Sequence, residues 1–211
     1  MTATPCCPAS HSSKRVVLTG GPGAGKTSVL ELIKKSFCAH VQVLPEAAGI
    51  LFGGGFPRRG DDASSRCAQR AIFHVQRELE TLVLGSADAA VVLCDRGTLD
   101  GLAYWPGRDD EYFGELGTTI DEEFSRYEAV IHLRTPASGG GYDHRNPLRN
   151  EDAAQAARID ERIAAIWGRH PRCVQVRNSA AFLDKARSVL ALVRAELPEC
   201  CRHHHVETID P

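Results

Sequence analysis

The sequence predicts an α/β fold in which helices cover both faces of a five-stranded parallel sheet. Short apolar runs alternate along the chain with longer segments whose apolar residues recur every three or four positions, and this alternation is typical of a parallel sheet with right-handed crossovers. Residues 89–94 (AAVVLC) are apolar throughout, as expected of a central strand buried on both faces. A length of 211 residues, without an internal repeat or an interdomain linker, indicates one domain.

Each strand is predicted by a short run of β-branched or apolar residues that turn-forming or polar residues bound. The first run, RVVLT, ends at a glycine-rich turn, and Pro45 ends the second run. In chain order, the strands are expected at residues 15–19, 41–44, 89–94, 129–133 and 173–176.

Each helix is predicted by apolar residues spaced to share one helical face. The pattern is strongest in the second helix, where Ile72, Val75 and Leu79 align. The helices are expected at residues 27–37, 66–84, 151–167 and 182–197. Glycine and proline predict loops at 51–65 and 135–150, and the acidic stretch 100–128 is expected to mix helices and loops.

The charge balance excludes one class of function. The chain has 25 Lys and Arg against 27 Asp and Glu, a formal net charge of −2, whereas a dedicated nucleic-acid binder is usually basic. The longest apolar runs also fall short of the roughly 20 residues that span a bilayer. We therefore expect neither a nucleic-acid partner nor a membrane span. The oligomeric state is open, with a homodimer as one option.

The two ends of the chain are expected to be flexible tails, at residues 1–14 and 198–211, around a domain at 15–197. Residues 1–14 lack the basic start and apolar stretch of a signal peptide, and single cysteines are typical of cytosolic proteins, so a cytoplasmic location is expected. The second tail contains Cys200 and Cys201 followed by three histidines. These are zinc-ligand types without the usual zinc-ligand spacing, so a solvated polar tail is the preferred interpretation.

The strongest signal is the phosphate-binding pattern GGPGAGKT at residues 20–27, which matches G-x-x-x-x-G-K-[ST] between a strand and a helix. Its glycines let successive backbone N–H groups turn towards phosphate oxygens at a helix amino terminus. Lys26 is expected to contact the β- and γ-phosphates, and Thr27 to hold Mg²⁺. The predicted nucleotide-binding residues of this loop are Gly21, Pro22, Gly23, Ala24, Gly25, Lys26, Thr27 and Ser28.

A second anchor is Asp95, which ends the third strand within LCDRG. In phosphate-loop proteins an acid at this position holds Mg²⁺, so Thr27 and Asp95 are the predicted metal residues. The sequence contains no N-K-x-D guanine signature. This absence favours ATP as the nucleotide while leaving GTP open.

The remaining polar groups favour a small-molecule kinase over a nucleotide hydrolase. Glu46 follows the second strand, which places it at the carboxyl edge of the sheet beside the phosphate loop. A carboxylate there is suited to take a proton from an acceptor hydroxyl. Arg96 is suited to hold the acceptor or the transferred phosphoryl group, and Asp100 and Tyr104 follow at helical spacing towards the same cleft.

Other candidates lie further along the chain. Gln76 borders the apolar stripe of its helix, where an amide can read a substrate edge. Arg145 and Arg149 fall in a lid expected at about 134–158, where they would neutralise charge on the γ-phosphate. Asn178 follows the fifth strand and is a candidate for adenine contact. His74 and His132 receive no role.

Five motifs in this order resemble the P-loop kinase-like family typified by the ribosylnicotinamide-kinase region of NadR, and especially its AAA-type ATP-binding members. They are GGPGAGKT, PEAA around Glu46, IFHVQRELE around Gln76, DRGTLDGLAY from Asp95, and R-N-E from Arg149. The resemblance covers roughly residues 15–197. It implies a P-loop NTPase three-layer fold with strand order 2-3-1-4-5.

The resemblance to the wider deoxynucleoside and thymidylate kinase class also implies roles. Glu46 would be the acceptor-side base, Asp95 the metal-side acid and Arg149 a lid arginine, beside Lys26 and Arg96 in the catalytic set. The chain departs from that class in its longer SGGG-containing lid segment and in Asp-Arg-Gly where the class shows Glu-Arg-Ser. The acceptor is therefore not transferred from the resemblance.

Two functions follow as hypotheses. The first is a Mg²⁺·ATP-dependent phosphotransferase acting on a small hydroxyl-bearing acceptor, such as a nucleoside or nucleotide. The second is an ATP- or GTP-binding regulatory switch or NTPase with a protein or lipid partner. A nucleic-acid-processing ATPase is disfavoured, because no basic patch with interleaved aromatic residues occurs.

Overall fold

The computed structural model describes residues 11–84, 89–136, 153–179 and 181–202. Its centre is a five-stranded parallel sheet in the order β2-β3-β1-β4-β5, which confirms the predicted fold class and strand order. The strands are β1 (Lys14–Thr19), β2 (Val41–Leu44), β3 (Val91–Asp95), β4 (Ala129–Leu133) and β5 (Cys173–Val176).

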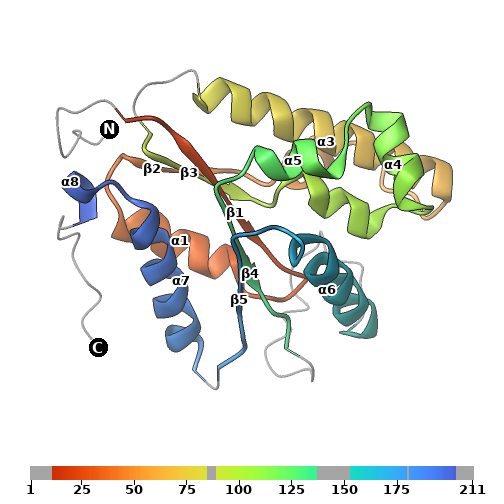
Figure 1. The fold of residues 1–211 in the computed structure, drawn as a ribbon. Coiled ribbons are helices and arrows are strands. Elements are labelled where there is room, and N and C mark those ends of the chain that lie inside the picture. Colours follow the sequence, from red (N-terminus) through yellow and green to blue (C-terminus); the bar gives the residue numbers. More distant parts are fainter. Residues whose placement is uncertain (1–10, 85–88, 137–152, 180, 203–211) are drawn as a thin grey trace.

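Helices cover both faces of this sheet, so the domain has three layers (Figure 1). One face is covered by α1 (Lys26–Ser36) and α7 (Phe182–Glu196), whose apolar residues share a core with the strands. The other face is covered by α3 (Asp62–Leu84), α6 (Ala153–Trp167) and the 3-10 helix η1 (Thr98–Tyr104). The shorter helices are α2 (Ala47–Gly53), α4 (Asp109–Leu116), α5 (Ile120–Ser125) and α8 (Glu199–Arg202).

The period-2 alternation of the strands divides their side chains between two cores. In β1, Val16 and Leu18 pack with α1 and α7, whereas Val17 packs on the opposite face with α3 and α6. All three side chains are fully buried. The strand is therefore apolar at consecutive positions, as the sequence pattern predicted for a sheet covered on both sides.

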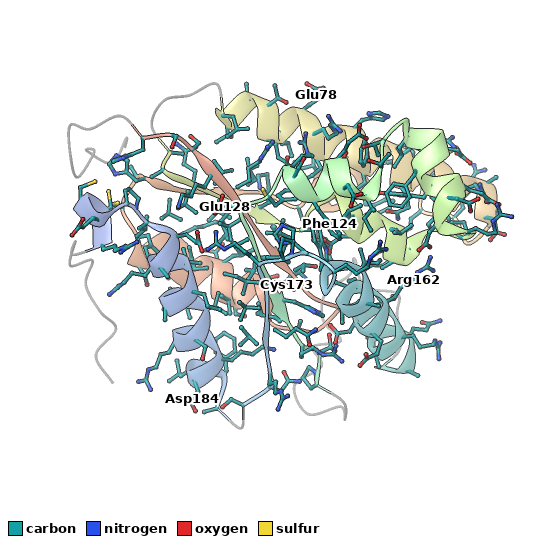
Figure 2. The ribbon with its side chains drawn as sticks, in the orientation of Figure 1. Glu78, Phe124, Glu128, Arg162, Cys173 and Asp184 are labelled. Atoms are coloured by element: carbon teal, nitrogen blue, oxygen red, sulfur yellow. The ribbon has the colours of Figure 1, made fainter. Side chains whose placement is uncertain are left out.

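The core beneath α3 and α6 is rich in aromatic residues. Trp167 packs against Phe124 at 5.9 Å and Tyr127 at 5.6 Å between ring centroids, and Trp105 packs edge-on against Tyr112 at 5.2 Å. Phe124, labelled in Figure 2, belongs to α5. This packing fixes η1, which follows the DRG segment (residues 95–97) at the end of β3.

One segment that was expected to be a loop contains parts of two helices. Residues 51–65 were predicted as a loop, but α2 extends to Gly53 and α3 begins at Asp62. The early start of α3 follows from Asp61, whose Oδ1 accepts a hydrogen bond from the Ser64 N–H as a helix N-cap does. The glycines that suggested a loop instead end α2, where Gly55 has a φ of 94°.

The carboxyl tail and the third strand also differ from expectation. Residues 199–202 form α8, and Cys201 is buried, so the prediction of a solvated flexible tail is wrong for this segment. The third strand begins at Val91 rather than at Ala89.

Within the described residues, no helix is both long and apolar enough to cross a membrane.

Candidate active site at the carboxyl edge of the sheet

A cavity of about 280 Å³ opens where the carboxyl ends of β1, β2 and β3 meet. The phosphate loop after β1 forms one end, and the inner face of α3 forms the other. Glu46, Asp95 and Arg96 line the junction between these two ends. The sequence predicted this convergence, because the carboxyl ends of parallel strands share one edge of the sheet.

The phosphate loop has the backbone geometry that its glycines permit. Gly25 is the residue before α1 and has a φ of 89°, in the left-handed region that glycine adopts at little cost. Thr27 and Ser28 are exposed in the first turn of the helix. Lys26 donates from Nζ to the Gly20 carbonyl at 2.9 Å, and burial together with the charge of Arg96 lowers its pKa to about 8. A bound polyphosphate would supply compensating negative charge.

The side chain of Asp160 in α6 binds the backbone of the phosphate loop. Its Oδ1 accepts from the Gly21 N–H at 2.9 Å and lies 2.9 Å from His132 Nε2. Its Oδ2 accepts from the Thr135 N–H at 3.2 Å and lies 3.1 Å from Arg134 Nε. Burial raises the pKa of Asp160, but the hydrogen bonds from His132, Gly21 and Thr135 outweigh it and hold that pKa below its ordinary value. One carboxylate thus joins the loop, β4 and the base of the expected lid.

The Asp160→Asn variant tests this connection. The amide places an NH₂ group opposite two donors and leaves buried groups unpaired, so we expect a loss of about 2–3 kcal/mol in unfolding free energy and weaker nucleotide binding. Glu161→Gln is the matched control on the same helix, since the Glu161 side chain is 69% exposed. Denaturant titration and nucleotide titration measure both effects. Equal behaviour of the two variants would contradict the assigned role.

Lys185 of α7 joins the other side of the loop to the sheet. Its Nζ donates to the Ala24 carbonyl at 2.8 Å, to the Arg134 carbonyl at 2.7 Å and to Asn178 Oδ1 at 2.9 Å. Burial lowers the pKa of Lys185 to about 8. The phosphate loop is therefore fixed from two elements, α6 and α7, before any ligand binds, which reduces the ordering cost of binding.

Asp95 ends β3 with an unsatisfied carboxylate. Among the described residues, its Oδ1 is a buried oxygen without a hydrogen-bond partner. Burial, opposed by the charge of Lys26, raises the pKa of Asp95 to about 6. An ionised buried oxygen without a partner is costly, and a cation is the usual compensation. The residues present therefore fit a Mg²⁺ ion held by Asp95 with the exposed hydroxyl of Thr27.

Arg96 follows β3 and contacts residues that follow β1 and β2, the two neighbouring strands. Its Nε lies 2.5 Å from Glu46 Oε1, and its Nη1 donates to Asp100 Oδ1 at 3.0 Å and to the Gly20 carbonyl at 3.2 Å. The guanidinium also lies over the Tyr104 ring, 5.8 Å from its centroid. Arg96 has a φ of 74°, a left-handed conformation that is uncommon for a residue with a side chain. Such local strain is often found at functional sites.

Asp100 is the support for this arrangement. Its Oδ1 accepts from the Thr19 hydroxyl at 2.5 Å, and its Oδ2 accepts from the Gly97 N–H at 3.0 Å and from Trp167 Nε1 at 2.9 Å. Asp100 lines the cavity, as expected, but donors satisfy both oxygens of this buried carboxylate, so its part is to orient Arg96. The sequence placed Asp100 at the cleft without indicating this supporting arrangement.

Glu46 precedes α2 and lines the cavity with a side chain that is 35% exposed. Burial raises its pKa, but the charges of Arg96 and Lys26 outweigh burial, and the pKa lies below its ordinary value. Glu46 is therefore ionised at neutral pH and can accept a hydrogen bond from a hydroxyl group at this position.

The far end of the cavity combines apolar and polar surface. Phe73 and Tyr104 line it beside Gln76, which is buried and donates from Nε2 to Glu80 Oε1 at 3.0 Å. Arg58 and Arg59 from the segment between α2 and α3 also line the cavity. Aromatic walls with a few oriented polar groups are typical of small-molecule pockets.

The structure brings most of the predicted site residues to one edge of the sheet. Asn178 follows β5 on the other side of the phosphate loop, where Lys185 binds its side-chain oxygen. Arg145 and Arg149 lie outside the described residues, as does most of the expected lid. His132, which received no role, contacts Asp160 beneath the loop. His74 is exposed and does not line the cavity.

Asp160 and Lys185 were not predicted. Each had one signal in the sequence: Asp160 lies among Ala156, Ile163 and Ala164 at helical spacing, so it falls on the buried face of α6. Lys185 lies beside Ala186 on the buried face of α7. A charged residue on a buried helical face must have partners, but the pattern does not say which partners these are.

Comparison with known families gives one match over most of the chain. The sequence matches a family described as an AAA domain over residues 15–182. No curated protein matches the sequence.

Several solved structures share the fold. NadR in complex with NR superposes with a TM-score of 0.66 and 16% identity over 95% of this chain and 55% of the NadR chain. NadR in complex with NAD and AMP-PNP superposes with a TM-score of 0.62 and 16% identity over 95% of this chain and 52% of the NadR chain. A thymidylate kinase from Candida albicans superposes with a TM-score of 0.60 and 13% identity over 89% of this chain and 93% of its own. The chain thus spans about half the length of the NadR chains that it matches.

Proposed function

Since the chain belongs to the AAA domain family, we propose that it is a Mg²⁺·ATP-dependent phosphotransferase whose acceptor is a small hydroxyl-bearing molecule of the nucleoside or nucleotide class. The observation that carries this proposal is the end of the cavity that lies against α3, away from the phosphate loop. A nucleotide hydrolase needs room only for an attacking water at this position, whereas a kinase needs an acceptor pocket.

The donor nucleotide would bind on the phosphate loop. The loop amides, Lys26 and the amino terminus of α1 supply positive potential for its phosphates. Arg145 and Arg149 are proposed to approach from the lid and neutralise charge that develops during transfer. Asn178 lies on the side of the loop away from the acceptor cavity, which supports its assignment to the adenine, with GTP as the alternative donor.

Thr27 and Asp95 would hold magnesium, which would supply positive charge to the β- and γ-phosphates. The protein groups around it have separate tasks. Lys26 holds the phosphates, and Arg96 fixes the orientation of Glu46 across the junction. Because Asp100 holds Arg96 in turn, the acceptor-side carboxylate is positioned before substrate binds.

The acceptor hydroxyl would hydrogen-bond to Glu46. The oxygen of the acceptor hydroxyl would attack the γ-phosphorus while the bond from this phosphorus to the β–γ bridging oxygen breaks and ADP leaves. The hydroxyl proton would pass to the Glu46 carboxylate. Gln76 and the aromatic walls would orient the rest of the acceptor. The similar folds of NadR and of thymidylate kinases support a nucleoside or nucleotide acceptor at the level of the fold.

The test is transfer from ATP to a panel of nucleosides and nucleoside monophosphates, with phosphorylated products identified by mass spectrometry. We expect one acceptor class to react. The Glu46→Gln variant is expected to lower kcat by about 10²–10⁴-fold while the KM for ATP changes little, since Glu46 does not contact the donor. Glu31→Gln, an exposed change on α1, is the control. An unchanged kcat in the Glu46 variant would exclude its assigned role.

A second candidate function is a nucleotide-dependent switch with a protein or lipid partner. The observation that favours it is the ion pair between Glu46 Oε1 and Arg96 Nε at 2.5 Å. This ion pair engages the carboxylate that a kinase would need as its base. A switch predicts a tight nucleotide complex with negligible transfer to every acceptor tested. Detection of a phosphorylated acceptor at a rate well above ATP hydrolysis would exclude the switch.

A further inference from the structure

A cluster of histidine and cysteine side chains lies at the edge of the sheet opposite the phosphate loop. His40 immediately precedes β2, His11 belongs to the amino-terminal segment, and Cys200 and Cys201 belong to α8. Figure 1 shows α8 beside the first described residues of the chain, and Figure 2 shows sulfur atoms next to α8. Residues from both ends of the sequence thus meet at one place.

The distances within the cluster are short enough for its side chains to share one metal ion. Candidate ligand atoms of His11, His40 and Cys201 all lie within 4.8 Å of one another. Cys201 Sγ is 3.5 Å from His40 Nδ1. Cys200 Sγ is 3.6 Å from His11 Nε2 and 3.8 Å from Cys201 Sγ.

These separations agree with the edges of a zinc tetrahedron. Zinc binds thiolate sulfur at ~2.3 Å and imidazole nitrogen at ~2.0–2.1 Å, so tetrahedral geometry puts a sulfur and a nitrogen ~3.5 Å apart and two sulfurs ~3.8 Å apart. The two sulfur–nitrogen contacts and the sulfur–sulfur contact match these values.

The cluster rests on a rigid support. His40 is 3% exposed, and its carbonyl accepts hydrogen bonds from the Ala90 and Val91 N–H groups at 2.9 Å each, so the β2–β3 edge fixes its backbone. Cys201 is 2% exposed, and its N–H donates to the Pro198 carbonyl at 2.9 Å. Buried ligands on fixed backbone are what a structural metal site requires.

We propose that His11, His40, Cys200 and Cys201 form a tetrahedral Zn²⁺ site that joins the amino-terminal segment, the sheet and α8. A set of four protein ligands leaves no open position, which is typical of structural rather than catalytic zinc. The sequence alone did not predict this set, because its members come from positions 11, 40 and 200–201 instead of from a local C-x₂-C or H-x₃-H spacing. The site is independent of the proposed phosphotransfer.

Cys38 is the competing fourth ligand, since its Sγ lies 3.7 Å from His40 Nδ1. Cys200 is preferred because its Sγ contacts two of the other three ligands, His11 and Cys201. Cys38→Ser therefore serves as the matched control for Cys200→Ser.

The test uses the full chain, stripped with a chelator and then titrated with Zn²⁺ or Co²⁺. We expect one metal ion per chain, a Co²⁺ spectrum with the intense visible bands of tetrahedral coordination and a near-ultraviolet thiolate charge-transfer band, and a thermal midpoint that rises with Zn²⁺. His40→Ala and Cys200→Ser are expected to weaken Zn²⁺ binding more than about a hundredfold, while Cys38→Ser keeps wild-type affinity.

The triple variant His203→Ala, His204→Ala, His205→Ala separates the cluster from metal capture by the following histidines, and it is expected to keep the stoichiometric metal. Circular dichroism of the metal-free proteins shows whether each variant folds, and the exposed Cys200 gives a substitution that the core tolerates. A substoichiometric metal content, an octahedral Co²⁺ spectrum, or loss of the metal in the triple variant would overturn the proposal.

Discussion

An Asp95→Asn variant is expected to lose phosphotransfer and, without ligands, to become harder to unfold. The loss should be at least about a hundredfold, because the carboxylate proposed to hold Mg²⁺ beside the phosphates is removed. The gain in unfolding free energy should be about 1–2 kcal/mol at pH 7.5, because the substitution removes a buried charge whose Oδ1 has no partner among the described residues. Activity and stability should therefore change in opposite directions.

The stability difference should depend on pH in one direction. Burial raises the pKa of Asp95 to about 6, above the value of 3.8 for a free aspartate. The folded state then binds the proton more tightly than the unfolded state, so the stability that Asp95 contributes is present below about pH 4 and is lost as the pH rises through 6. The advantage of the asparagine variant should appear above pH 6 and vanish near pH 4.

Denaturant unfolding without Mg²⁺ at pH 4, 6 and 7.5 measures this difference. Asp100→Asn is the matched control, since all four donors to Asp100 remain in place and the variant should be destabilised at neutral pH. If the Asp95 variant is less stable than the native protein at pH 7.5, the carboxylate is satisfied in the folded protein and its assignment as the metal-side acid is wrong.

An Arg96→Ala variant is expected to lose about 2–4 kcal/mol of unfolding free energy and most of its activity. The guanidinium compensates Glu46 and Asp100 while only 15% of its side chain is exposed, so truncation leaves two carboxylates without their cation. Calorimetry or denaturant titration gives the stability, and the transfer assay gives kcat. A stability loss below about 0.5 kcal/mol would mean that these ion pairs contribute little.

Comparison with Arg96→Gly separates the side chain from the backbone. Both variants lose the guanidinium, but glycine adopts the φ of 74° without steric cost. We therefore expect the glycine variant to be more stable than the alanine variant by about 0.5–1 kcal/mol. The opposite order would show that the left-handed conformation at this position is not strained.

Local patterns in the sequence predicted the sheet, its main helices and the residues that line the cavity at the strand ends. The apolar strands, the glycine pattern and the residue at each strand end are local features, and the parallel topology turns strand ends into spatial neighbours. For this reason the sequence predicts Glu46, Asp95 and Arg96 beside Lys26, where they line one cavity.

The contacts that the sequence did not predict are long-range. Asp160 contacts Gly21 over 139 positions, and Lys185 contacts Ala24 over 161. Helical spacing places both charges on buried faces, but their partners depend on the register between elements. The histidine–cysteine cluster at the opposite edge was missed for the same reason, since α8 must fold back before Cys201 meets His40.

We propose that the two ends of the cavity bind different substrates, with the donor nucleotide at the phosphate loop and the acceptor against α3. A crystal structure with Mg²⁺ and a non-hydrolysable ATP analogue tests it most directly. We expect the triphosphate on the backbone amides of residues 23–27, the metal beside Thr27 and Asp95, and the end of the cavity lined by Gln76 and Tyr104 still open. A structure in which the base and ribose of the same nucleotide fill that cavity would contradict it.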